Sequence, residues 1–91
     1  HYPLDHLIRA SIRKYSQTFI LKKIRLEYQA VNQNVITDKK WLCFVIEQIL
    51  SNALKYTEKG GTIQIFTKQE SNQLWLVIED NGMGRRFATS I

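Results

Sequence analysis

The chain has 91 residues, of which 44% are hydrophobic and 23% are charged, and its formal net charge is +5. This composition indicates one small globular domain, or a piece of one, and excludes a disordered chain. The single cysteine, Cys43, excludes an internal disulfide framework and fits a reducing compartment. No apolar run approaches the ~18 residues that would indicate a membrane span.

The first predicted element is a helix over Leu4–Lys22, in which Asp5 would complement the positive end of the helix dipole. Its apolar residues recur at helical spacing, and they are Leu7, Ile8, Ile12, Tyr15 and Phe19. Many of the basic residues lie between Arg9 and Arg25, without interleaved aromatic residues in a stacking pattern. A solvated helix face is therefore favoured over a nucleic-acid surface.

Residues Ile24–Val31 alternate between apolar and polar side chains, which predicts a half-buried strand. Residues 32–34 (Asn-Gln-Asn) supply turn chemistry, and Val35-Ile36 is expected to form a short further strand. Thr37 or Asp38 would then cap the next helix.

The second predicted helix, with its apolar periodicity over Trp41–Thr57, ends near Glu58, before the Gly60-Gly61 pair. Its apolar stripe consists of Leu42, Val45, Ile46, Ile49 and Ala53. At about 100° per residue, Gln48, Asn52 and Lys55 group on one flank of this stripe, with Tyr56 between that flank and the core. Glu47 points to the other flank.

Two strands are expected to follow, Thr62–Gln69 and Gln73–Asp80, paired antiparallel through a hairpin at 70–72. Asp80 continues the inward-facing series of the second strand, so its carboxylate is aimed toward the helix-covered side and needs a hydrogen-bond donor. That donor is either a ligand or a neighbouring backbone amide. The order helix, strand, helix, strand, strand predicts an α+β fold with helices on one face of the sheet.

Two stretches together resemble the N box and the first glycine box of the ATP-binding domain of sensor histidine kinases. They read WLCFVIEQILSNALKYT over 41–57 and LWLVIEDNGMG over 74–84. The helix is similar to the pattern N-L-L-x-N-A-x-K-Y-T, with Gln48 in place of the first asparagine and Ile49 in place of a leucine. The resemblance implies an incomplete two-layer α/β sandwich whose mostly antiparallel sheet is covered by helices on one face.

The resemblance also implies an adenine site. Asp80 would accept a hydrogen bond from the exocyclic amine of adenine, and Tyr56 would pack against the ring. Gly82 and Gly84, in the turn D-x-G-x-G, would let the backbone pass close to the base without side chains.

The phosphate side of the implied site lies on the second helix. Asn52 would ligate Mg²⁺ through its amide oxygen, and Lys55 would neutralise phosphate charge. In related ATPases a glutamate at the position of Gln48 activates water, and glutamine cannot act as a general base. Phosphoryl transfer from ATP to a histidine is therefore favoured over hydrolysis.

The segment Arg85–Ile91 departs from the family pattern, because no lid and no second glycine-rich motif follow Gly84. We therefore expect residues 1–91 to be a partial ATP-binding domain (N box 41–57, first glycine box 80–84) that binds ATP weakly and is inactive alone. Its expected partners are the histidine-bearing dimerisation domain of a parent kinase and, through it, a response regulator. An unfinished sheet edge also favours a homodimer. The expected location is the cytoplasmic side of a membrane-anchored parent, without membrane contact by this segment.

Two alternatives belong to other classes of protein. One is a non-catalytic module that keeps this scaffold and binds a protein partner. The other, less favoured because of the charge pattern above, is a small basic nucleic-acid-binding domain.

Overall fold

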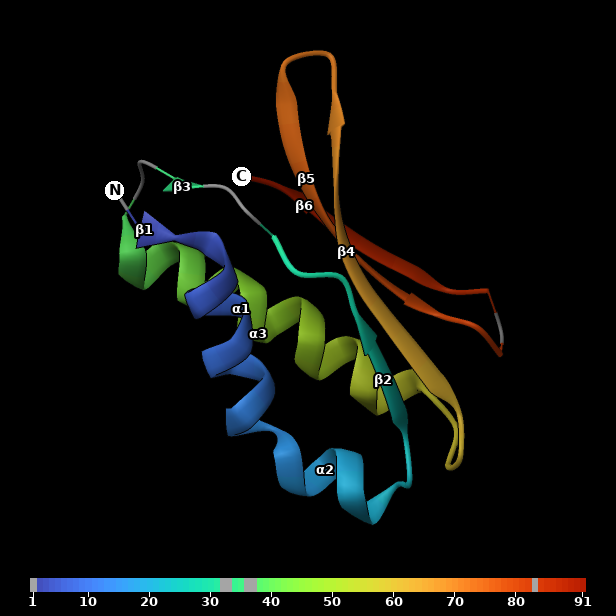
Figure 1. The fold of residues 1–91 in the computed structure, drawn as a ribbon. Coiled ribbons are helices and arrows are strands. Elements are labelled where there is room, and N and C mark those ends of the chain that lie inside the picture. The colour runs from blue at the N-terminus through green and yellow to red at the C-terminus, as the bar shows by residue number, and fades with distance from the viewer. Residues whose placement is uncertain (1, 32–33, 36–37, 83) are drawn as a thin grey trace.

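The computed structural model of the chain describes residues 2–31, 34–35, 38–82 and 84–91. In chain order its elements are β1 (Tyr2–Pro3), α1 (Leu4–Lys14), α2 (Ser16–Leu21), β2 (Arg25–Tyr28), β3 (Asn34–Val35), α3 (Lys39–Tyr56), β4 (Thr62–Glu70), β5 (Gln73–Asp80) and β6 (Arg86–Ser90). The helices lie together on one face of the main sheet (Figure 1), as the α+β prediction required.

The main sheet has the strand order β2-β4-β5-β6, with β2 parallel to β4 and the other pairs antiparallel. The predicted hairpin between β4 and β5 is confirmed. Its turn residues Ser71 and Asn72 have φ values of 52° and 65°, which match the twist of a tight two-residue hairpin turn. β1 and β3 form a separate antiparallel pair. Of the predicted strand Val35-Ile36, Val35 lies in β3, and Ile36 lies outside the described residues.

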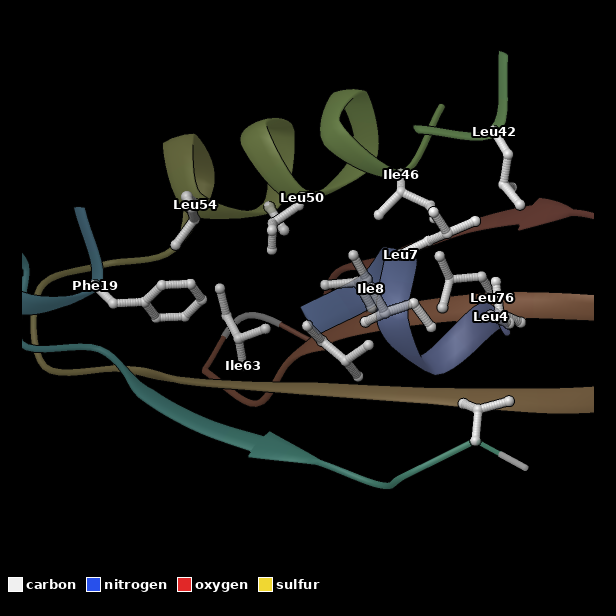
Figure 2. Close-up of a cluster of buried hydrophobic side chains, with 14 of the residues drawn as sticks. Leu4, Leu7, Ile8, Phe19, Leu42, Ile46, Leu50, Leu54, Ile63 and Leu76 are labelled. Atoms are coloured by element: carbon white, nitrogen blue, oxygen red, sulfur yellow. The ribbon is translucent and has the colours of Figure 1, made fainter. Parts of the chain in front are cut away.

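α3 covers the sheet with one apolar face and packs against α1, β5 and β6. Figure 2 shows its leucines and Ile46 pointing at side chains from α1 and the strands. The buried residues of this face are Leu42, Ile46, Leu50, Ala53 and Leu54. The buried face of α3 is therefore offset from the apolar stripe that the sequence predicted. Val45 and Ile49 of that stripe are only partly buried, because the sheet and α1 meet the helix closer to Leu50. Asp38 caps the helix by accepting from the Lys40 N–H at 3.0 Å, and Thr37 lies outside the described residues.

The prediction of one helix over Leu4–Lys22 was wrong, because the helix breaks at Tyr15, where φ is −102° and ψ is 16°. The break starts a second short helix, α2, and lets Phe19 turn its ring into the core, where it is 8% exposed (Figure 2). Ile20 and Leu21 remain exposed on the outer side of α2.

No strand was assigned to Arg85–Ile91 from its sequence. Residues 86–90 form β6, which pairs with β5 along its length and carries an ion pair from Arg86 to Glu79 at 3.2 Å. Without β6, β5 would pair with β4 alone and would leave backbone groups unpaired along its other edge. Those unpaired groups are the physical reason why residues 86–90 form a strand. α3 also ends at Tyr56, two residues before the predicted end at Glu58.

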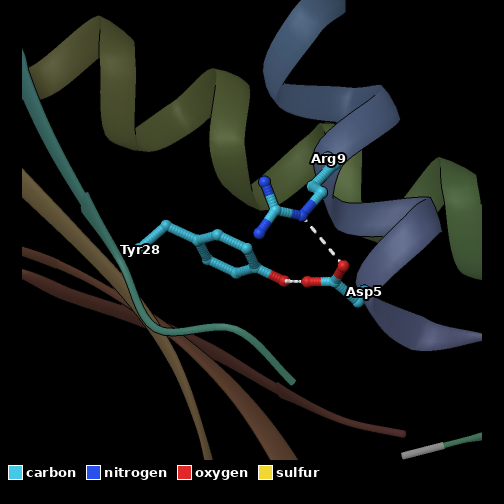
Figure 3. A network of polar contacts seen from close by, with 3 residues as sticks. All are labelled: Asp5, Arg9 and Tyr28. Atoms are coloured by element: carbon cyan, nitrogen blue, oxygen red, sulfur yellow. Dashed lines mark hydrogen bonds and ion pairs between the residues drawn. The ribbon is translucent and has the colours of Figure 1, made fainter. Parts of the chain in front are cut away.

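A polar network ties α1 to β2 (Figure 3). The hydroxyl of Tyr28 donates to one carboxylate oxygen of Asp5, and Arg9 Nε donates to the other at 2.8 Å. The Tyr28 bond, followed by Arg9, lowers the pKa of the Asp5 carboxyl. Burial, and then the bond to Asp5, raise the pKa of Tyr28 above its usual value. The Asp5 side chain predicted to complement the helix dipole therefore also fixes the position of β2.

This network predicts a pH dependence of stability. Because the folded pKa of Asp5 is depressed, its contribution is present above the ordinary value of 3.8 and is lost as the pH falls through the lower folded value. We expect Tyr28→Phe to lower the free energy of unfolding by about 1 kcal/mol between about pH 5 and pH 9, and by progressively less below pH 4. Urea unfolding across this pH range measures the difference. Tyr15→Phe, which removes a hydroxyl outside this network, is the control, and a pH-independent difference for Tyr28→Phe would contradict the assignment.

Candidate functional site

A pocket of about 260 Å³ lies where the C-terminal end of α3 meets the turn after β5. Its lining residues are Glu58, Lys59, Gly60, Gly61, Asp80 and Gly82. Three of these are glycines, so much of the wall is bare backbone. A flat ligand can therefore approach the main chain closely.

Asp80 is the acidic group of this pocket. It ends β5 opposite Ile63 on β4, and it is 3% exposed, as its inward-facing position predicted. Its Oδ1 accepts from the Gly82 N–H at 2.8 Å, which is the backbone-amide donor considered from the sequence. A carboxylate has about four acceptor positions on two oxygens. This one bond therefore leaves acceptor capacity on a group that lines the pocket.

The turn that carries Asp80 is locked to the start of β4 by Asn81. The Asn81 N–H donates to the Thr62 carbonyl at 3.1 Å, and the Thr62 N–H donates to the Asn81 side-chain oxygen at 3.2 Å. On the other side, the Asp80 N–H donates to the Arg85 carbonyl at 2.9 Å. Asn81 was not predicted as a site residue, although asparagine between aspartate and glycine is a recognisable turn signal.

The opposite wall, residues 57–61, is held by the segment before β2. Lys22 Nζ donates to the Leu54 carbonyl at 2.6 Å, and the Gly60 N–H donates to the Lys22 carbonyl at 2.8 Å. The Arg25 N–H adds a bond to the Gly61 carbonyl at 2.9 Å. Lys22 thus satisfies a carbonyl in the last turn of α3, where a cation also complements the helix dipole. No sequence motif marked Lys22, since its partners come from distant parts of the chain.

The row of site residues predicted on α3 does not line the pocket. Gln48, Asn52, Lys55 and Tyr56 are all exposed on the helix. Since Tyr56 is two residues from the pocket wall and a helix rises 1.5 Å per residue, the row extends roughly 12 Å away from the pocket. Glu47 faces the other flank, as predicted, where it accepts from Lys14 Nζ at 2.6 Å and raises the pKa of that lysine.

Tyr56 has neighbours that sequence reasoning missed. Its ring stacks on Phe87 of β6 with centroids 6.4 Å apart and planes 12° from parallel. Two cations approach the ring, Lys55 Nζ at 5.5 Å and Arg85 Cζ at 5.0 Å from the centroid. Arg85 and Phe87 were missed because no structure was assigned to that segment. The result is an aromatic pair with two positive charges close to the pocket.

Gly84 has φ of +70°, in the left-handed region that favours glycine, whereas Gly82 does not. Within the described residues, no group of three histidine, cysteine or acidic side chains is arranged to hold a metal ion. In the same part of the chain, no helix combines the length and the apolar character needed to cross a membrane.

This geometry has counterparts among known proteins. Residues 37–86, which include α3, the pocket loop and the Asp80 turn, match the family described as histidine kinase-, DNA gyrase B-, and HSP90-like ATPase. The chain belongs to this family, as its two motifs predicted.

Its relatives are sensor kinases. The chain is 37% identical over 81 residues to the sensor protein BceS of Bacillus subtilis (strain 168). The aligned region covers 89% of this chain and 24% of BceS. It is 44% identical over 54 residues to the sensor protein kinase GraS of Staphylococcus aureus (strain MRSA252), covering 59% of this chain and 15% of GraS. The chain is thus homologous to the ATPase domain of sensor histidine kinases, and it spans about a quarter or less of these relatives.

Solved structures show the same fold. The catalytic domain of histidine kinase ThkA superposes with a TM-score of 0.77 at 19% identity, covering 89% of this chain and 57% of that one. The mycobacterial sensor histidine kinase MprB superposes with a TM-score of 0.75 at 25% identity, covering 87% and 52%.

The close packing around Gly61 yields a stability prediction. A Cβ at Gly61 would lie 2.9 Å from Thr57 Cγ2 and 3.0 Å from the Glu58 carbonyl, whereas one at Gly82 would meet only Asp80 Oδ1 at 3.4 Å. We expect Gly61→Ala to lower the free energy of unfolding by about 1–3 kcal/mol. Gly82→Ala is the matched control, with a change below about 0.5 kcal/mol. Thermal and urea unfolding measure both, and equal losses would show that the loop does not depend on this approach.

Proposed function

We propose that this chain binds ATP with its adenine beside Asp80, as the nucleotide-binding part of a sensor histidine kinase. The observation that carries the proposal is a nearly buried carboxylate in a pocket walled largely by glycine backbone. Besides the bond from the Gly82 N–H, the carboxylate has acceptor positions left, and the exocyclic amine of adenine is a donor that could fill one of them. Membership of the ATPase family supports the same ligand.

The size of the pocket limits what it can hold. Its volume of about 260 Å³ is just below the roughly 300–1,000 Å³ of typical small-molecule pockets. It therefore suits a base, while the ribose and phosphates would lie outside, toward the exposed row of α3. Lys55 and Arg85 supply positive charge on that path, and affinity would be weak because these groups are solvated.

Tyr56 is proposed to pack against the adenine ring. An aromatic pair flanked by two cations suits a ligand that combines a flat ring with anionic groups. Gly82 and Gly84 are proposed to keep side chains away from the base.

Asn52 is proposed to contribute one oxygen to Mg²⁺, which would neutralise phosphate charge when bound. Mg²⁺ commonly takes one or two protein oxygens, keeps several waters and binds substrate phosphates. Such a site does not require the carboxylate cluster that the described residues lack.

The absence of a general base at Gln48 favours phosphoryl transfer over hydrolysis in this proposal. The neighbouring carboxylate, Glu47, is paired with Lys14 on the far flank of α3. The γ-phosphate would then pass to a histidine on a separate domain of a parent kinase, and from there to a response regulator, on the cytoplasmic side. We propose residues 1–91 as a partial domain that supplies ATP but does not complete this transfer alone.

One observation favours the second candidate, a non-catalytic protein-interaction module. The Tyr56 ring that the proposal assigns to adenine already contacts two side chains of this chain, because Phe87 stacks on it and Arg85 lies over it. These contacts compete with an adenine ring for the same surface of Tyr56. A nucleic-acid-binding domain gains less support, since Arg9, Lys14 and Arg86 each form an ion pair with a carboxylate.

Calorimetric titration with ATP and GTP tests the adenine site. The wild-type chain is expected to bind ATP with a Kd of about 0.1–1 mM and to bind GTP more weakly, because GTP lacks the exocyclic amine at that position. Asp80→Asn should weaken ATP binding by about tenfold or more and remove the preference for ATP. Glu79→Gln is the control, because Glu79 is the adjacent carboxylate and pairs with Arg86 instead. Undiminished binding by a folded Asp80→Asn variant would contradict the proposal.

The proposed metal ligand has a separate signature. Asn52→Ala should abolish the increase in ATP affinity that Mg²⁺ produces, while leaving metal-free binding within about twofold, because its contact is with the ion. Glu58→Ala, which changes an exposed residue of the pocket wall, should retain the full magnesium effect. Titrations with and without MgCl₂ compare the two variants, and an equal magnesium effect in both would remove Asn52 from the site.

A further inference from the structure

A second hollow, of about 550 Å³, lies between α1 and β2, and it shares no lining residue with the pocket beside Asp80. Its lining residues are Arg9, Ile12, Arg13, Leu26 and Tyr28. We call it the α1–β2 groove. It has an apolar floor and two guanidinium groups on one wall.

The other wall is a strand edge. Among the described strands, β2 is the outer strand of the main sheet and pairs with β4 alone. The parallel ladder uses alternate residues, since the Arg25 N–H donates to Gly61 and the Gln29 N–H donates to Ile65. The backbone groups of Leu26 and Tyr28 therefore point to the side away from β4. These are the two residues of β2 that line the groove.

On the α1 wall, the spacing between Arg9 and Arg13 is close to that between alternate residues of a strand. Arg9 Cζ lies 5.1 Å from the Tyr28 ring centroid and its Nε pairs with Asp5, so its guanidinium is oriented (Figure 3). Arg13 is exposed one turn further along the helix. Four helical residues span about 6 Å, and alternate residues of a strand about 6.6–6.8 Å. Two acidic side chains at positions i and i+2 of an added strand would therefore match Arg9 and Arg13.

We propose that the α1–β2 groove binds an extended acidic segment of a partner protein, which adds to the sheet as a strand beside β2. The main-chain groups of Leu26 and Tyr28 provide the hydrogen bonds, and Arg9 and Arg13 select carboxylates on the face of the segment that looks toward α1. Asp5 offsets part of the charge of Arg9, and Arg13 adds a second cation, so the wall favours an acidic ligand. An α-helical ligand would leave the strand edge unpaired.

A second copy of this chain is a poorer occupant of the same edge. Pairing β2 with its own copy would place two α1 helices on the same face of the joined sheet, on either side of the seam. Arg9 and Arg13 would then approach their counterparts, and like charges at such a contact are unfavourable. The homodimer expected from the exposed edge therefore has an electrostatic cost that an acidic partner does not.

Labelled seven-residue peptides of alternating glutamate and threonine test the proposal by fluorescence anisotropy with the 91-residue chain. The acidic peptide is expected to bind with a Kd of about 0.1 mM, and its lysine–threonine counterpart about tenfold more weakly. Two N-methylated forms provide the sharper test. In an added strand, one alternate set of N–H groups faces β2 and the other faces solvent. Methylation of one set should abolish binding, and methylation of the other should not. Loss with both sets, or with neither, would overturn strand addition.

Variants of the chain locate the site. Arg13→Glu should weaken binding of the acidic peptide about fivefold, while Lys68→Glu, an equal charge change near the β4–β5 hairpin, should not. Amide exchange measured by NMR adds a backbone readout. Bound peptide should slow exchange at Leu26 and Tyr28, and equal effects at residues far from β2 would overturn the assignment. Light scattering that shows a dimer of the wild-type chain, strengthened by Arg13→Glu, would also overturn it in favour of a second copy.

Discussion

Burial of one face of α3 against the sheet sets the position of the rest of the candidate site. Leu42, Ile46 and Leu50 are each no more than 1% exposed, and they belong to the same buried cluster as inward-facing residues of β4 and β5 (Figure 2). A rotation of the helix by one residue would move every side chain by about 100°. The contact therefore decides both which residues form the core and that Gln48, Asn52 and Lys55 face solvent.

The pocket depends on contacts at its two walls. Lys22 holds the α3 end and the glycine loop, while Asn81 holds the turn of Asp80 against Thr62. In each bond one partner, Lys22 or Thr62, lies outside the two family motifs. The turn of Asp80 has only a weak sequence pattern, yet its conformation is fixed, because its backbone N–H and carbonyl groups bond to specific partners rather than to water. Phe87 and Arg85 then extend the same region onto β6.

The pocket beside Asp80 and the α1–β2 groove differ in what they offer a ligand. The pocket beside Asp80 is small, acidic at its base and close to two cations on Tyr56. The α1–β2 groove is larger, basic and open along a strand edge. They are nevertheless joined through β2: the Arg25 N–H, at the start of this strand, bonds to Gly61 in the wall of the first pocket. A strand added to β2 would thus lie against an element that also supports the nucleotide loop.

The amino-acid sequence by itself determined the family, most of helix α3, the β4–β5 hairpin and the inward position of Asp80. Each follows from local periodicity, from turn chemistry or from a motif of adjacent residues. The tertiary structure alone decided the break at Tyr15, the strand at Arg86–Ser90, the true centre of the α3 face at Leu50 and the clamps by Lys22 and Asn81. These features depend on partners distant in the chain. A short segment such as 86–90 becomes a strand because β5 offers it unpaired backbone groups, and a lysine becomes a helix cap because a carbonyl 32 positions away lies within 2.6 Å.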